Sequence, residues 1–204
     1  MRRHAIAERL KLPVMVNVDG YIITHTYEPV IIPSAEQIKK YLPDYKPEPG
    51  QFLDPANPAT LGALVTPTHY MEIRQELHDD LTASLKIIEQ EYKNFNKTFP
   101  DLIMKKNINN GLVEYVGPKK PETILVAMGS VIGTIKDTVD DLRKEGKKVG
   151  ALKITTYRPF PKQAIYDAIK NIPEIAVLDK SISLGAYGPL YTDLLSVFQG
   201  KNNC

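Results

Sequence analysis

Apolar residues follow three different patterns along the chain. Residues 12–18, Leu-Pro-Val-Met-Val-Asn-Val, form an apolar run rich in valine that ends at the turn dipeptide Asp19-Gly20. Residues 70–99 carry apolar side chains at steps of three and four, the spacing of one face of a helix. Residues 111–199 alternate short apolar runs with helical periods. We therefore expect a buried strand at 12–18, a long amphipathic helix over 70–99 and an α/β region after it.

The third zone predicts an alternation of strands and helices. Strands are expected at 124–128, 149–156 and 175–178, and helices at 134–145, from Pro161 onward and at 189–198. Thr134 followed by Asp137 resembles a capping box, and Gly146 stands where a helix C-cap is typical. Because this alternation is typical of parallel sheets, we predict an α/β fold, with a three-layer parallel-sheet domain over residues 111–204.

Prolines separate this domain from the start of the chain. Eight of the sixteen prolines lie within residues 29–67, where they remove backbone donors and prevent a continuous helix or central strand. We interpret that stretch as an extended linker, followed by the long helix and its connection over residues 68–110. The apolar stripe of the helix is expected to pack on a domain or a neighbouring subunit rather than to bind a cofactor.

Composition and charge exclude several classes of protein. The 26 basic and 24 acidic residues leave a net charge of +2, so neither nucleic acid nor a membrane is an expected partner. With no apolar run of about 20 residues and no secretory pattern, the cytoplasm is the expected compartment. The single cysteine, Cys204, excludes an internal disulfide, a thiolate zinc site and a cysteine-ligated iron–sulfur cluster within this chain.

Few residues carry candidate chemistry. Gly129-Ser-Val-Ile-Gly133 lies between an expected strand and helix, where glycines allow a phosphate to approach a helix N-terminus. It lacks the dinucleotide and P-loop fingerprints, so a tight turn is favoured over a phosphate site. The four histidines are scattered without metal-site spacing. His25 follows the Asp-Gly turn beside Thr24, and a hydrogen-bonded structural histidine is favoured over a substrate contact.

Arg158 is expected at the carboxyl end of a parallel strand, where open α/β sheets present ligands and interfaces. An arginine there binds a carboxylate or phosphate, or pairs with an acidic residue. We favour the ion pair. Asp179, which ends the next expected strand, is the expected partner if the two strands are neighbours.

Several segments together resemble the alpha subunit of pyruvate:ferredoxin oxidoreductase (pyruvate synthase). Residues 12–30 resemble the close of its first domain and residues 53–58, Leu-Asp-Pro-Ala-Asn-Pro, its linker. Its second domain is matched in order and at similar spacing by residues 124–134, 157–161 and 177–183. The resemblance implies that residues 1–28 are the tail of a pyrimidine-binding domain and that residues 111–204 are similar to the carboxy-terminal domain of transketolase.

The resemblance also implies a reaction, cofactors and partners. The family carries out the thiamine-diphosphate-dependent oxidative decarboxylation of a 2-oxoacid; coenzyme A takes the acyl group and ferredoxin takes the electrons. Thiamine diphosphate, Mg²⁺ and 4Fe-4S clusters belong to the full assembly, with partner subunits of beta, gamma and delta type. The second domain organises the dimer rather than the chemistry.

This chain departs from the family pattern where the cofactor would bind. Most of the pyrimidine-binding domain is missing, and the Gly-Asp-Gly motif with its following asparagine is absent, since Val18 precedes Asp19 and the next asparagine is Asn57. The family also continues into a further strand, so a sheet edge is expected to lack its neighbour. We interpret the chain as a fragment that has no catalytic, cofactor-binding or metal-binding residues and is inactive alone.

Five residues are the candidates to face the active site or an interface of the assembled enzyme: Thr24, His25, Gly129, Ser130 and Arg158. Two other functions are weighed against an enzyme fragment. A free-standing interaction module without activity predicts no exposed apolar patch, whereas a fragment predicts exposed apolar surface on the 70–99 helix and near residues 1–28. A fragment of another transketolase-like thiamine enzyme, such as a 2-oxoacid dehydrogenase beta chain or deoxyxylulose phosphate synthase, is disfavoured by the linker and by residues 18–25.

Overall fold

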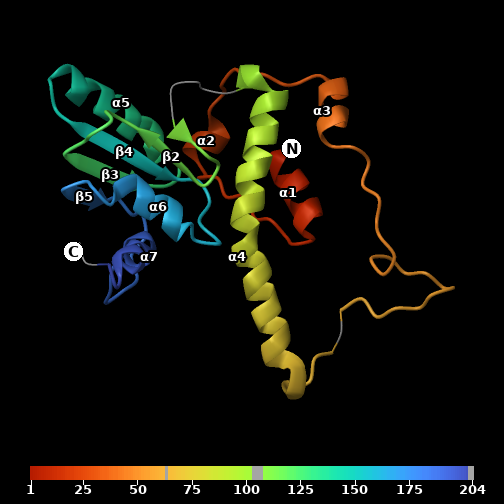
Figure 1. The fold of residues 1–204 in the computed structure, drawn as a ribbon. Coiled ribbons are helices and arrows are strands. Elements are labelled where there is room, and N and C mark those ends of the chain that lie inside the picture. Colours follow the sequence, from red (N-terminus) through yellow and green to blue (C-terminus); the bar gives the residue numbers. More distant parts are fainter. Residues whose placement is uncertain (63, 103–107, 202–204) are drawn as a thin grey trace.

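The computed structural model describes residues 1–62, 64–102 and 108–201. A long helix stands beside a small α/β domain, and the amino-terminal segments pack along the helix (Figure 1). The elements in chain order are α1 Arg2–Leu10, α2 Ile22–His25, α3 Ala35–Tyr41, α4 Pro67–Thr98, the 3-10 turn η1 Pro100–Leu102, β1 Ile108–Asn109, β2 Val113–Val116, β3 Thr123–Ala127, α5 Val131–Lys144, β4 Val149–Ile154, α6 Lys162–Ile169, β5 Glu174–Val177 and α7 Pro189–Phe198.

The sheet of the α/β domain is mixed, so the prediction of a parallel sheet is wrong in part. Its strand order is β1-β2-β4-β3-β5, in which β3 pairs in parallel with both β4 and β5. By contrast, β2 runs antiparallel to β4 and β1 antiparallel to β2. Only the loop 117–122 separates β2 from β3, which is shorter than the dozen or so residues that a parallel crossover requires. The chain therefore reverses direction there.

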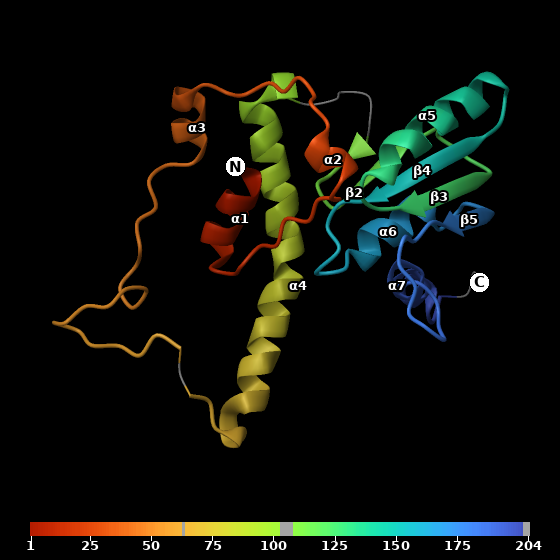
Figure 2. The ribbon, with the colours of Figure 1, turned by 180° about the vertical axis from the view of Figure 1, so that it is seen from behind.

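Helices cover both faces of this sheet, as a three-layer arrangement requires. Ile124 and Val126 of β3 point to α6 and α7, where they pack with Leu152 of β4 in the larger core. The alternate residue Ala127 points to the other face and packs against α5. This alternation follows from the period of two along a strand. The expected α/β class and three layers are present, and Figure 2 shows α5 and the pair α6 and α7 on opposite sides of the strands.

Helix ends lie close to where sequence signals place them, with one exception. Pro67 is the first residue of α4 and Pro189 of α7, because proline fits the first helical turn, whose amides lack partners. Gly146, at φ +84°, follows the end of α5 as expected. The predicted capping box at Thr134 is wrong, because α5 begins three residues earlier, with Ser130 as its N-cap.

The second half of α4 is the support on which α1 and α3 pack. Glu91 is buried; it accepts a hydrogen bond from the hydroxyl of Tyr41 on α3, and its carboxylate lies 3.8 Å from Arg9 of α1. The ring of Tyr41 packs edge-on against Phe95 and Phe99, with centroids 5.6 and 5.3 Å away. These contacts hold both short helices along one side of α4.

The α/β domain meets the same part of α4. Gly111 adopts φ +87°, and a Cβ at this position would lie 2.9 Å from the Cβ of Tyr92, so the close approach of the two segments requires glycine. One residue earlier, Asn110 donates a hydrogen bond from Nδ2 to Glu89 at 3.0 Å. The helix and the sheet are therefore in direct contact.

Two predictions about the first third of the chain need correction. Residues 12–18 form no strand and pair with no strand of the sheet, and Met15, Val16 and Val18 are exposed. Pro67 already begins α4, and the described residues of the linker before it, 29–62 and 64–66, contain no strand and one helix, α3. A capping box starts that helix, since Ser34 and Gln37 exchange hydrogen bonds between side chain and backbone. Among the described helices, none is long and apolar enough to cross a membrane.

Stability should depend on the domain core and not on the first half of α4. Leu152→Ala should lower the free energy of unfolding by about 2–5 kcal/mol, because it leaves a cavity in a fully buried position. Ile73→Ala, in a part of α4 without buried residues, should change it by less than about 0.5 kcal/mol. Urea denaturation followed by circular dichroism measures both, and similar losses for the two variants would contradict this placement of the core.

Candidate functional site

The turn between β3 and α5 is the part of the structure most similar to a ligand site. Gly129, at φ +84°, turns the chain from β3 into α5. The amide of Ser130 donates a hydrogen bond to the carboxylate of Asp19, and a Cβ on Gly129 would lie 3.0 Å from the same carboxylate. Asp19 precedes Ser130 by 111 residues. The N-terminus of α5 is therefore capped by a carboxylate from the amino-terminal segment, which the helix dipole favours.

The contact between Asp19 and Ser130 also affects the charges at this edge of the sheet. Hydrogen bonds from Ser130, first from its side chain and then from its backbone amide, lower the pKa of the Asp19 carboxyl below its ordinary value. The ammonium group of Lys180, which follows β5, lies 3.9 Å from Asp19. A phosphate at this turn would have to displace a carboxylate of the same chain. The tight-turn interpretation of Gly129 and Ser130 agrees with this geometry.

A second aspartate makes a similar contact at the next helix. Asp179, just after β5, accepts a hydrogen bond from the amide of Leu190 at 2.7 Å, at the start of α7. Its other oxygen accepts from the amide and the hydroxyl of Ser181, both at 3.2 Å. A Cβ on Gly188 would collide with this carboxylate, so glycine is required for the contact. Asp179 therefore works as a cap within its own domain.

Arg158 is paired, but the predicted partner Asp179 is wrong. Its guanidinium donates a hydrogen bond of 2.8 Å to Asp193 of α7 and one of 2.9 Å to the carbonyl of Tyr157. It also lies over the ring of Tyr157, 4.1 Å from the centroid. The sheet order explains the error, because β3 separates β4 from β5, so the ends of those two strands are not adjacent.

Thr24 and His25 form a small local cluster on α2. Nδ1 of His25 lies 2.7 Å from the carbonyl oxygen of Tyr21 and 3.0 Å from the hydroxyl of Thr24. The ring of Tyr21 lies 5.4 Å from that of His25, centroid to centroid. His25 is exposed, and its ring is held by Tyr21 and Thr24. Figures 1 and 2 both place α2 between α4 and the sheet.

The five candidate residues thus fall into three places. Gly129 and Ser130 meet Asp19, whereas Thr24 and His25 contact each other and Tyr21. The contacts of Arg158 are with its own loop and with α7. Sequence reasoning missed Asp19 as a cap and Asp193 as an ion-pair partner, since no local pattern links residues so far apart. Within the described residues, no group of three or more histidine, cysteine, aspartate or glutamate side chains could hold a metal ion.

Comparison with known proteins gives matches along both parts of the chain. Residues 1–93 match the family model "Pyruvate flavodoxin/ferredoxin oxidoreductase, thiamine diP-bdg", and residues 121–204 match "Pyruvate:ferredoxin oxidoreductase core domain II". Pyruvate synthase subunit PorA of Methanocaldococcus jannaschii is 43% identical over 198 residues, which are 97% of this chain and 49% of that protein. Ketoisovalerate oxidoreductase subunit VorA of Pyrococcus horikoshii is 35% identical over 93% of this chain and 46% of its own length.

Among solved structures, 2-oxoglutarate:ferredoxin oxidoreductase from Magnetococcus marinus is similar to 47% of this chain and 16% of its own, at 19% identity and a TM-score of 0.31. That likeness is too distant to add to the description of the fold. The chain spans about half the length of the curated relatives that it matches.

The contact between Asp19 and Ser130 should weaken in acid. A folded-state pKa below the unfolded value means that folding favours the ionised carboxylate. The contact should therefore be fully stabilising above about pH 4, the ordinary pKa range of aspartate, and should be lost as the pH falls through the lowered value. Amide NMR shifts of Ser130 followed from about pH 6 to about pH 2 report this titration. Asp19→Ala should abolish it, and a titration that persists in this variant would contradict the assignment.

Proposed function

The chain belongs to the family of pyruvate synthase alpha subunits, and we propose that it is the part of such a subunit that organises assembly. The complete enzyme would decarboxylate a 2-oxoacid, pyruvate in the first instance, with thiamine diphosphate as cofactor. Coenzyme A would take the acyl group and ferredoxin the electrons. The observation that carries the proposal is the 43% identity to a pyruvate synthase subunit across 97% of the chain.

The domain division follows from the same proposal. Residues 1–28 would be the tail of a pyrimidine-binding domain and residues 29–67 the linker. Residues 68–110 would form the long helix with its connection, and residues 111–204 a domain like the carboxy-terminal domain of transketolase. The parallel strands β3, β4 and β5, covered by helices on both faces, support the last likeness. The antiparallel strands β1 and β2 add to that plan at one edge of the sheet.

The described residues do not fit the cofactors of the family. One matched family model takes its name from thiamine diphosphate, yet the turn most suited to a phosphate, at Gly129 and Ser130, holds the carboxylate of Asp19. A second negative charge is disfavoured there. The chain has one cysteine, and a 4Fe-4S cluster takes four. We therefore propose that thiamine diphosphate, Mg²⁺ and the 4Fe-4S clusters are held by other parts of the full assembly.

Partners follow from the same reasoning. We propose that subunits of beta, gamma and delta type bind this chain, and that ferredoxin and coenzyme A act through the assembly. Thr24, His25, Gly129, Ser130 and Arg158 remain candidates for an interface. Two of the three helices that follow the parallel strands, α5 and α7, are capped by an aspartate of this chain, which supports a structural role for that edge.

A free-standing interaction module is the second candidate, and the exposed surface argues against it. Tyr70, Met71 and Ile73 on α4 and Met15 and Val18 near the first helix are exposed apolar residues. A module that works alone is expected to cover such residues, because large apolar patches mark interaction sites or promote aggregation. Another transketolase-like thiamine enzyme is disfavoured by the relatives, which are subunits of pyruvate synthase and ketoisovalerate oxidoreductase.

An activity assay tests the proposal. The chain alone should show no pyruvate-dependent reduction of a viologen dye in the presence of thiamine diphosphate, Mg²⁺ and coenzyme A. Activity should appear when the chain is combined with the other pyruvate synthase subunits of M. jannaschii and with the part of its PorA that this chain does not align with. Omission of pyruvate or of coenzyme A serves as the control. A mixture that assembles but does not turn over would count against the proposed function.

Arg158→Ala should disturb assembly rather than turnover. The change leaves Asp193 without its 2.8 Å partner and removes the guanidinium from the ring of Tyr157. Because exposed ion pairs contribute roughly 0.2–1 kcal/mol, the yield of assembled complex should fall by up to about fivefold. Turnover per assembled complex should stay within about twofold. Arg143→Ala, which breaks an exposed pair with Asp140, is the matched control. Lower turnover with normal assembly would show a catalytic role for Arg158 instead.

A further inference from the structure

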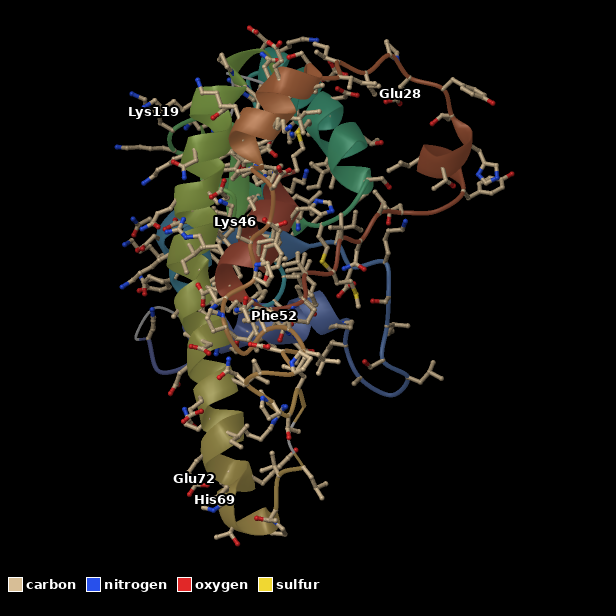
Figure 3. The ribbon with its side chains drawn as sticks, turned by 90° about the vertical axis from the view of Figure 1, so that its right-hand side faces the viewer. Glu28, Lys46, Phe52, His69, Glu72 and Lys119 are labelled. Carbon is tan, nitrogen blue, oxygen red and sulfur yellow. The ribbon has the colours of Figure 1, made fainter. Side chains whose placement is uncertain are left out.

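The first half of α4 extends away from the rest of the protein. Residues 67–83, here called the arm, contain no buried residue, whereas Ser84, Glu91 and Tyr92 in the second half are buried. In Figure 3, His69 and Glu72 lie at the end of α4 that is farthest from the sheet. The arm is therefore a stretch of helix with no fully buried side chain.

One face of the arm is apolar. The stripe consists of Tyr70, Ile73, Leu77 and Leu81, spaced by three and four residues. Tyr70 is 54% exposed and Ile73 43%, and Leu77 is only partly buried. The same stripe continues along α4 to Tyr92, which is 8% exposed where Arg2 of α1 covers its ring at 4.8 Å. The stripe thus has a partner along its second half only.

The arm would gain stability from a partner. Most of the stability of helices in proteins comes from the packing of their apolar face, and the arm has no buried residue. Further exposed apolar residues lie in the linker, among them Val30, Ile31 and Leu64. Most of the exposed large apolar residues of the described chain fall within residues 1–93, the part that matches the thiamine-diphosphate-binding family model. This concentration indicates a missing partner for that part.

We propose that the arm stripe, Tyr70, Ile73, Leu77 and Leu81, is the docking surface for the remaining half of the alpha subunit, the half of its relatives that this chain does not align with. The inference rests on the proposed function and names the partner of its assembly surface. The relatives are about twice as long as this chain, so they contain a segment of the size that such a surface needs.

The charge of the arm argues against a second copy as the occupant. Residues 67–83 carry four acidic side chains, Glu72, Glu76, Asp79 and Asp80, against the single cation Arg74. Two arms packed together would bring these like charges close to one another, which is unfavourable. The partner surface should therefore be an apolar groove with lysine or arginine at its rim, offered by a different polypeptide segment.

Binding can be measured without any activity. The probe is the part of M. jannaschii PorA that does not align with this chain, titrated into the full 204-residue chain by isothermal calorimetry. The double variant Ile73→Asp/Leu77→Asp places two charges in the stripe. The matched control, Thr68→Asp/Thr82→Asp, places two charges on the opposite face of the same helix. Circular dichroism checks that α4 persists in both, and Ile73→Ala/Leu77→Ala repeats the test with no added charge.

The stripe variant should bind the probe at least about 100-fold more weakly than the unmodified chain, because two apolar side chains lose their burial. The control should stay within about threefold. Equal weakening by both double variants, or no binding by the unmodified chain, would overturn the inference. So would a dimer of the chain alone that only the stripe variant abolishes. A complex that forms through the stripe but lacks turnover would contradict the proposed function and leave the docking surface standing.

Discussion

The arrangement of the helices depends on the contacts made by the buried carboxylate of Glu91. Glu91 lies on the second half of α4 and accepts a hydrogen bond from the hydroxyl of Tyr41 of α3, with Arg9 of α1 3.8 Å away. Burial, followed by the contact with Glu91, raises the pKa of Tyr41 well above its ordinary value, so this hydroxyl stays a donor at any physiological pH. A buried carboxylate without such partners is strongly destabilising. The second half of α4 thereby holds α1 and α3 in place.

The α/β domain contacts the same half of α4, and the N-termini of two of its helices are capped by side chains of this chain. Glycine at position 111 allows the sheet to approach Tyr92, and the helices α5 and α7 receive carboxylates from Asp19 and Asp179. The edge where parallel sheets usually bind ligands is therefore filled by side chains of this chain. Arg158, at the same edge, is paired with Asp193. These satisfied groups support the proposal that the domain has a structural role in assembly.

The first half of α4 has the opposite character. Its polar groups are solvated, whereas the apolar residues of its stripe lack the burial that stabilises the second half. The second half of α4 thus holds this chain together, whereas the first half carries the docking surface that we propose. The linker that leads into the arm is also rich in exposed apolar residues.

The sequence by itself determined the elements that depend on local periodicity and on proline or glycine signals. The long helix over 70–99, the helix over 189–198 and the three strands near 124, 149 and 175 all follow from contacts within a few residues along the chain. Only the tertiary structure decided that β2 reverses the sheet, that Asp193 and not Asp179 pairs with Arg158, that Asp19 caps α5, and that residues 12–18 stay outside any sheet. Each of these outcomes depends on which distant segment lies alongside, and periodicity within one segment carries no information about its neighbours in space.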